Sequence, residues 1–334
     1  MKNKKINSII FRIIFSLVGL FSLLKIIKKY GFTNLVEEVN QTGFLLVLLA
    51  LTFIPTLICY AVSWMLASDH QRMFQESSIF KKISIFTKIT VVSIAWNNLT
   101  PFLKVGGEPL KYLMLSKYLP KSDALASTIN YNIIHLLATG VSFVVTSIVL
   151  VLFYQMPNEV RYYLLGFAFV FSISLYLLIW ILRVKFVYIA FTFRYRILRV
   201  IIVNIKVAFR RLLKFYNKSP GIFCSSLIID IIARFIEGLT FYFGFYLIKH
   251  QISFLSSSLL DVGRTFVDNI FFFVPYQIGT REEGVRFFME KILFVDSKGF
   301  LSAVFLYRFV EITWIFIGYI IWVSTKSSSK ELSV

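Results

Sequence analysis

Hydrophobic and polar positions follow one another along the chain in long blocks, and six of the apolar blocks are long enough for a membrane helix. These six blocks are residues 6–24, 43–66, 124–154, 162–182, 222–248 and 300–323. About 20 apolar residues cross the hydrocarbon core as an α-helix. Two further apolar stretches, 83–119 and 254–296, contain a polar interruption near their middle. The pattern predicts an all-α polytopic membrane protein.

Composition supports this class and excludes others. Of the 334 residues, 57% are hydrophobic and 16% are charged, which is too apolar for a soluble globular domain. The net charge of +19 comes from basic residues in short segments between apolar blocks, as in cytoplasmic loops of membrane proteins. Nucleic acid is therefore not an expected partner. Cys59 and Cys224 lie inside apolar blocks, and we expect neither a metal site nor a cofactor.

The two interruptions share a design. In residues 96–112 and again in residues 275–284, a proline is followed seven residues later by a glutamate, with glycine between them. The pairs are Pro101 with Glu108 and Pro275 with Glu282. Irregular backbone at membrane depth persists only where it is buried in protein or lines a wet cavity. We expect both breaks to be functional.

Basic residues predict the orientation of the chain. Lysines precede the first block, and residues 183–218 hold ten Lys or Arg and no acid, which places both on the cytoplasmic side. The second segment also has helical spacing that suits a membrane interface; specific recognition of anionic lipid and a loop that only fixes topology both remain open. Counting crossings then makes 83–119 a re-entrant hairpin from the cytoplasm and 254–296 one from outside. Both termini are expected in the cytoplasm.

An internal comparison favours an inverted repeat within a single membrane domain, residues 1–334. A shift of 174 residues carries Pro101 onto Pro275 and block 43–66 onto block 222–248. We expect a first repeat over 1–158 and a second over 159–182 and 219–326, each of about four elements with one hairpin. Inverted repeats with discontinuous helices are typical of transporters whose site lies near the bilayer midplane.

The first break carries chemistry of its own. Gly106 and Gly107 let the backbone approach a ligand closely, and Glu108 with Pro109 is typical of a helix start. Bare N–H groups at a half-helix N-terminus, beside a lysine such as Lys111, would suit a phosphate. The alternative is a tight turn that only caps a structural helix.

Charged residues inside the other apolar blocks are further candidates. Each costs about 2.5 to 3.5 kcal/mol at the bilayer centre, so we expect them to face the interior and pair with one another. In chain order they are Asp230, Arg234, Glu237, Asp261, Arg264, Asp268, Arg281, Glu282, Arg308 and Glu311. Residues 230, 234 and 237 are expected on one helix face. We expect His135 to be a hydrogen-bonded interior residue rather than a proton relay.

These motifs resemble the flippase-like membrane domain of lysylphosphatidylglycerol synthases and its stand-alone relatives, over nearly the whole chain. The first-half motif consists of Asn98, Pro101, Gly106, Gly107, Glu108, Pro109 and Lys111. The second-half motif consists of Pro275, Gly279, Arg281 and Glu282, followed by Tyr307 and Arg308. Many relatives carry a Glu-Arg pair where this chain has Asn132 and Ile133. The chain ends at Val334, so we expect no soluble aminoacyl-transferase domain.

The resemblance implies movement of a lipid between leaflets of the bacterial inner membrane. The expected site residues are those of the two motifs except Tyr307, together with Asp230, Arg234, Glu237 and Asp268. The expected partners are membrane lipids with an anionic or zwitterionic headgroup, and the sequence leaves open an oligomer and a separate lipid-modifying enzyme. Two alternatives remain: a membrane-embedded transferase that modifies a lipid headgroup, and an accessory subunit of such an enzyme.

Overall fold

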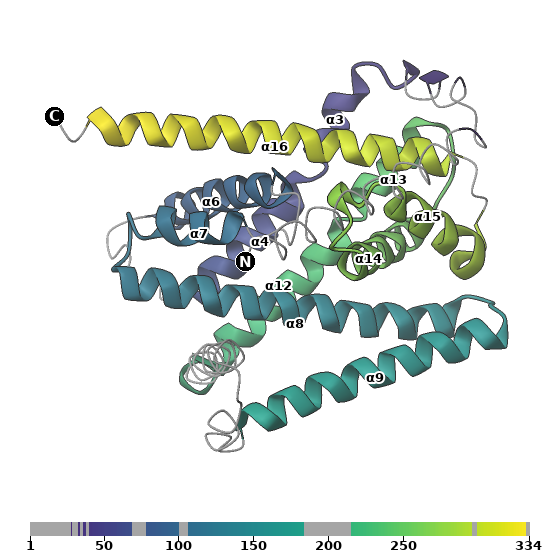
Figure 1. The fold of residues 1–334 in the computed structure, drawn as a ribbon, viewed down its shortest axis with the longest axis horizontal. Helices are drawn as coiled ribbons and strands as arrows, with labels where there is room; N and C mark the ends of the chain where they lie inside the picture. Colours follow the sequence, from purple (N-terminus) through teal and green to yellow (C-terminus); the bar gives the residue numbers. More distant parts are fainter. Residues whose placement is uncertain are drawn as a thin grey trace, which may run out of the picture. The chain divides into compact units, whose positions relative to one another are not determined.

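The computed structural model describes residues 40–68, 78–99, 106–183, 215–295 and 299–331, with isolated positions between residues 28 and 37. Within these ranges the chain is helical and contains no strand (Figure 1). The expected first span, Pro101 of the first break and most of the basic segment 183–218 lie outside the described residues.

The chain divides into two compact units. One unit holds the described residues up to Ile58, those of 87–111 and those from Ala233 onward. The other holds the described residues of 59–86 and 112–232.

The unit containing residues 112–232 is built on two long neighbouring helices, α8 (Lys121–Phe153) and α9 (Asn158–Arg183). Figure 1 shows them side by side, joined by a short turn. Most of α4 (Ile54–Ala67) and α12 (Pro220–Ile236) complete the unit. Trp64 of α4 is fully buried, stacks on Tyr131 at 5.3 Å between ring centroids and donates a hydrogen bond to Ser127 Oγ at 3.1 Å. This aromatic contact joins α4 to α8.

The other unit is assembled along α16 (Phe300–Glu331). This helix packs against α3 (Leu45–Leu51), α13 (Leu239–Leu247) and α15 (Thr280–Phe287). Trp314 of α16 donates its indole N–H to the carbonyl of Ala50 at 2.9 Å. The same unit holds the end of α6 (Ile79–Leu99) and the start of α7 (Gly107–Leu115).

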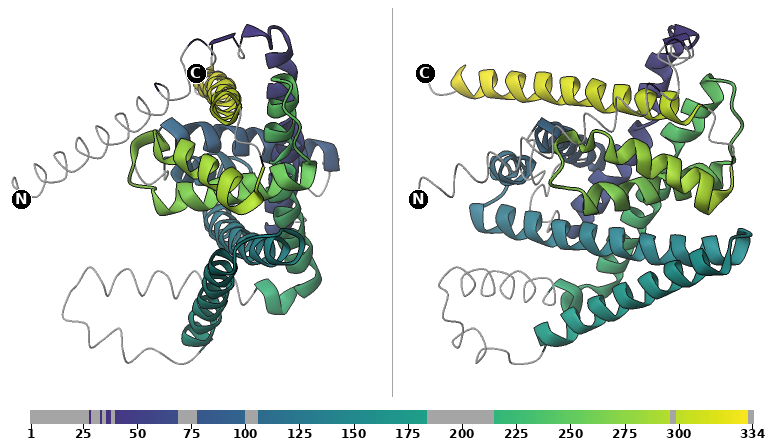
Figure 2. Two further views of the ribbon diagram at one scale, coloured as in Figure 1. Left: turned by 90° about the vertical axis from the view of Figure 1, so that its right-hand side faces the viewer. Right: turned by 45° about the vertical axis from the view of Figure 1, so that its right-hand side comes forward.

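Helices α14 (Phe254–Ile270) and α15 form an antiparallel hairpin that continues into a π-helical turn, Phe288–Leu293 (Figure 2). Three contacts define its direction: Asp268 meets Arg281, Val267 meets Gly284, and Gly263 meets Phe288. A Cβ atom at either glycine would overlap the facing side chain. Glycine therefore permits the close approach of the two helices.

The observed helices match several predicted blocks. Among the described residues, three helices are long and apolar enough to cross a membrane: Leu45–Ala67, Lys121–Phe153 and Phe300–Thr325. The expected span 222–248 is instead interrupted at Glu237 and Gly238, between α12 and α13. A Cβ atom at Gly238 would overlap the backbone of Ser258, so α14 lies directly against this turn.

Candidate functional site

The loop between α14 and α15 has an unusual backbone. Pro275–Gln277 form a short 3-10 turn in which Tyr276 and Gln277 have φ angles of 54° and 49°, and Gly279 follows with φ 80°. Left-handed conformations cost energy for residues other than glycine and tend to cluster at functional sites. The loop turns the carbonyl groups of Tyr276 and Gln277 towards Arg308 of α16, whose guanidinium donates to them at 3.1 and 3.3 Å.

Glu282 joins this loop to α16. One carboxylate oxygen accepts the backbone N–H of Gly279 at 2.7 Å, which caps the start of α15. The other accepts from Nε and Nη2 of Arg308 at 2.8 and 2.7 Å. Because Glu282 is fully buried, both bonds are shielded from solvent.

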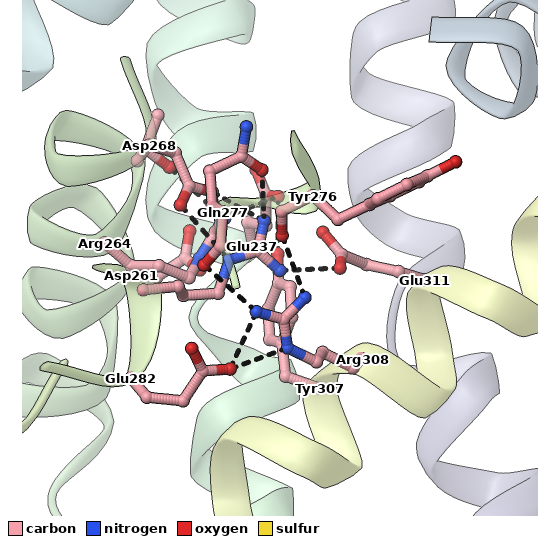
Figure 3. Close-up of polar contacts among 12 residues, drawn as sticks. Glu237, Asp261, Arg264, Asp268, Tyr276, Gln277, Glu282, Tyr307, Arg308 and Glu311 are labelled. Atoms are coloured by element: carbon pink, nitrogen blue, oxygen red, sulfur yellow. Dashed lines mark hydrogen bonds and ion pairs between the residues drawn. The ribbon is translucent and has the colours of Figure 1, made fainter. Parts of the chain in front are cut away.

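Arg281 is the next member of the same buried network, and Figure 3 shows its partners Asp268, Gln277 and Glu311. Its Nε and Nη2 atoms donate to the two carboxylate oxygens of Asp268 at 3.1 and 2.7 Å. Its Nη1 atom donates to Glu311 Oε2 at 2.6 Å, and the Gln277 side-chain oxygen accepts from Nη2 at 3.4 Å. A side chain that is 2% exposed therefore connects α14, α15 and α16.

Arg264 distributes one positive charge over three acids. Its Nε donates to Asp261 and its Nη1 to Asp268, both at 2.8 Å, while Nη2 donates to Glu237 at 3.3 Å. Its guanidinium carbon also lies 4.5 Å from the ring centre of Tyr307, a cation–π geometry. Spacings of three and four residues place Asp261, Arg264 and Asp268 on one face of α14.

Glu237 lies in the turn between α12 and α13 and brings a third part of the chain to the network. Its Oε1 atom accepts the hydroxyl of Tyr307 at 2.9 Å as well as the Arg264 guanidinium. Arg234 Nη1 lies 3.9 Å from its Oε2 atom. Tyr307 in turn stacks on Phe241 of α13 at 4.8 Å.

The network has more acid than base and one accessible edge. Among the described residues it contains five carboxylates against four guanidiniums. The carboxylates are those of Glu237, Asp261, Asp268, Glu282 and Glu311, and the guanidiniums are those of Arg234, Arg264, Arg281 and Arg308. The side chains of Glu311 and Arg308 are 25% and 18% exposed, and Tyr276 is 49% exposed. A polar group could therefore be bound at this edge, in surroundings where electrostatic interactions are strong.

The first break is tied internally in a similar way. The backbone N–H of Gly107 donates to the side-chain oxygen of Asn97 at 2.7 Å, and the Lys111 ammonium donates to Glu108 at 3.0 Å. A Cβ atom at Gly107 would overlap the Ser93 carbonyl, so the start of α7 lies against α6. The groups expected to suit a phosphate thus already have partners within the chain.

The remaining members of the first motif are less enclosed. Gly106 lies in the turn before α7, Pro109 is exposed, and Asn98 is half-buried at the end of α6. Asn97, rather than Asn98 of the motif, is the residue that caps α7.

Asp230 lies on α12, four residues before Arg234, and its carboxylate is bound by side chains of α4 and α8. Its carboxylate is fully buried, lies 2.9 Å from His135 Nδ1 and accepts the Ser63 hydroxyl at 3.2 Å. The unit of residues 112–232 therefore has its own buried polar cluster, formed by α4, α8 and α12. The hydrogen bond of His135 is of the kind expected from the sequence.

Several residues of the network and of the first break were not among the expected site residues. They are Asn97, Asp261, Arg264, Gln277, Tyr307 and Glu311. The sequence contains a signal for Asp261, Arg264 and Glu311, since a charge within an apolar block needs a partner. No comparable signal exists for Gln277, because its role depends on a left-handed backbone conformation.

In the described ranges, no group of His, Cys, Asp and Glu side chains has a geometry that could hold a metal ion. The network consists of ion pairs and hydrogen bonds among side chains of the described residues.

Comparison with known proteins gives one result. The family model described as "Lysylphosphatidylglycerol synthase TM region" matches residues 9–318. At the significance we required, no curated protein and no solved structure matches the chain.

Proposed function

The chain belongs to the lysylphosphatidylglycerol synthase transmembrane-region family, and from this premise we propose that it moves a lipid between the leaflets of the bacterial cytoplasmic membrane. The match covers most of the chain and includes both breaks and the whole ion-pair network. A membrane protein of this family has a lipid as its most direct substrate, and the headgroup is the part that needs a polar path.

The buried network carries the proposal. Buried charges are costly in a membrane protein and are retained mainly where they line a substrate or ion path. Here they lie on or against a helical hairpin with a glycine break and a left-handed loop, and Glu311 and Arg308 of α16 form an accessible edge. We place the headgroup at this edge during transport.

The pairing of the arginines bears on the kind of headgroup. Arg281 and Arg308 each bind carboxylates directly, so neither offers an uncompensated positive charge to an anionic headgroup. The excess of one acid instead favours a headgroup with an ammonium group, which Glu311 could accept. We therefore propose a zwitterionic or otherwise ammonium-bearing lipid rather than a purely anionic one.

We further propose that the two breaks are re-entrant hairpins of an inverted repeat. In such a repeat, a contact between a first-half residue and a second-half residue has an equivalent contact. Its members lie 174 positions after the first residue and 174 positions before the second. The hydroxyl contact of Ser63 with Ser226, at 3.1 Å, would have its counterpart between Thr52 and position 237. Thr52 in fact contacts Thr240 at 3.2 Å, one helical turn from that position, which supports the proposal.

Purified protein in vesicles with a fluorescent lipid tests the transport function. A membrane-impermeant quencher destroys the fluorescence of the outer leaflet, so transport appears as additional loss of signal over time. We expect faster loss for vesicles that contain the protein than for empty ones, with a labelled phosphatidylethanolamine as the probe.

The same preparation separates the alternatives. A membrane-embedded transferase would produce a lipid of altered mass in the presence of a group donor, without faster exchange between leaflets. An accessory subunit would do neither alone. Either outcome would contradict the proposed transport.

A further inference from the structure

A chain of alternating acids and bases connects the most deeply buried part of the network to its accessible edge. It runs from Asp261 to Arg264 at 2.8 Å, to Asp268 at 2.8 Å, to Arg281 at 2.7 Å and to Glu311 at 2.6 Å. Asp261 is 1% exposed, whereas the Glu311 side chain is 25% exposed. Asp261 and Glu311, the acids at the two ends, are thus each paired with an arginine that also binds Asp268.

Asp261 is the least compensated acid of this chain. Its Oδ1 atom accepts from Arg264, but its Oδ2 atom is buried and has no hydrogen-bond donor among the described residues. The other charged or titratable groups near it are Arg234 from the last turn of α12, Glu237 from the α12–α13 turn and Tyr307 from α16. Buried carboxylates are normally hydrogen-bonded through both oxygens or become neutral by taking up a proton.

The charge count leads to the same residue. With every group ionised, the network holds one negative charge more than positive. Each of the other four acids has either two partners with positive charge, a backbone N–H in addition to its arginine, or some exposure to solvent. One proton on Asp261 Oδ2 would balance the network at the position where a carboxylate oxygen lacks a donor.

We propose that Asp261 binds a proton that is exchanged for the ammonium group of the lipid headgroup bound at Glu311. This inference rests on the proposed transport function and adds its coupling ion. When an ammonium group neutralises Glu311, Arg281 no longer has to neutralise Glu311 and interacts more strongly with Asp268. Arg264 then interacts less with Asp268 and more with Asp261, which stabilises the ionised form of Asp261. The proton then leaves to water. By reciprocity, protonation of Asp261 weakens binding of the ammonium group.

Binding of a soluble lipid as a function of pH tests the exchange. The probe is dihexanoylphosphatidylethanolamine below its micelle concentration, titrated into the purified full chain over the mildly acidic to neutral range, where its amine stays protonated. A one-for-one exchange strengthens binding by about tenfold for each unit of rising pH below the titration of Asp261. Asp261→Asn, a neutral side chain of the same shape, should bind the probe weakly and without this dependence.

Infrared difference spectra of the wild-type protein at two pH values give a readout that requires no lipid. A carbonyl band of a protonated carboxyl group should be present at the lower pH and missing in Asp261→Asn, while Glu283→Gln, a partly exposed control outside the network, should retain it. Equal pH dependence of binding in wild type and Asp261→Asn, or retention of the band in that variant, would overturn the proton site. If the wild-type protein transports no lipid but the band is lost in Asp261→Asn, the proposed function is wrong and the proton site is supported.

Discussion

Arg281 and Asp268 form a two-point ion pair across the break that separates α15 from α14, with both carboxylate oxygens bound at 3.1 and 2.7 Å. Two parallel hydrogen bonds fix the guanidinium in orientation as well as in distance. The pair therefore holds the two arms of the hairpin together where the backbone is irregular, and it aims the third donor of Arg281 at Glu311.

Loss of this pair should strongly destabilise the hairpin. Asp268→Asn removes the carboxylate that Arg264 and Arg281 share. Removal of one partner of a buried ion pair costs about 3 to 5 kcal/mol of folding free energy. We expect a large fall in apparent melting temperature in detergent. Glu283→Gln breaks a partly exposed pair with Arg286 and should cost about 0 to 1 kcal/mol. Equal melting temperatures for the two variants would mean that the network does not stabilise the fold.

Glu282 has two roles that substitution can separate. Glu282→Gln keeps an oxygen that can accept the Gly279 N–H but removes the charge that faces Arg308, whereas Glu282→Ala removes both. We expect the Ala variant to be less stable than the Gln variant by about 0.5 to 2 kcal/mol, the usual contribution of a helix cap. Thermal unfolding of both proteins measures the difference. Identical stability would show that the cap contributes nothing.

Gly107 should tolerate no side chain. A Cβ atom there would overlap the Ser93 carbonyl, so Gly107→Ala must push α7 away from α6 and disturb the first break. We expect lower thermal stability and slower lipid transport. Gly166→Ala in α9 is the matched control, since nothing lies within 4 Å of its Cβ position and alanine favours the helix by about 0.5 to 1 kcal/mol. A Gly107→Ala protein as stable and active as this control would disprove the close contact.

The re-entrant hairpins can be tested by labelling single cysteines in a variant without Cys59 and Cys224. Cysteines at exposed Phe80 and Tyr118, at the two ends of the first hairpin, should react with an impermeant reagent from the cytoplasmic side. Cysteines at Gln251 and Phe294, at the ends of the second, should react only from the opposite side. Opposite sides for the two ends of either hairpin would make it a full crossing and remove the inverted repeat.

The sequence predicts helices and local pairs better than contacts between elements. The ranges predicted from the apolar blocks 43–66, 124–154 and 300–323 agree closely with observed helices, because a long apolar run has few alternatives to a membrane helix. The pairing of Asp261, Arg264 and Asp268 follows from spacing along one helix.

Other contacts depend on which helix faces which, and periodicity does not contain that information. Asp230 lies on the same helix as Arg234, as the spacing predicts, but its bond to His135 from a distant block could not be predicted from spacing. In the same way, neither spacing nor composition joins Arg281 to Glu311, since the contact depends on α16 lying against α15.

If the lipid headgroup passes the accessible edge formed by Glu311 and Arg308, two matched glutamine variants should differ in their transport rates in vesicles. Glu311→Gln keeps the shape and an acceptor for Arg281 but removes the charge proposed to receive the ammonium group, while Glu290→Gln neutralises a half-buried acid on the π-helical turn. We expect at least about tenfold slower transport of labelled phosphatidylethanolamine for Glu311→Gln, corresponding to about 1.4 kcal/mol, and a wild-type rate for Glu290→Gln. Equal rates for the two variants would contradict passage of the headgroup at this edge.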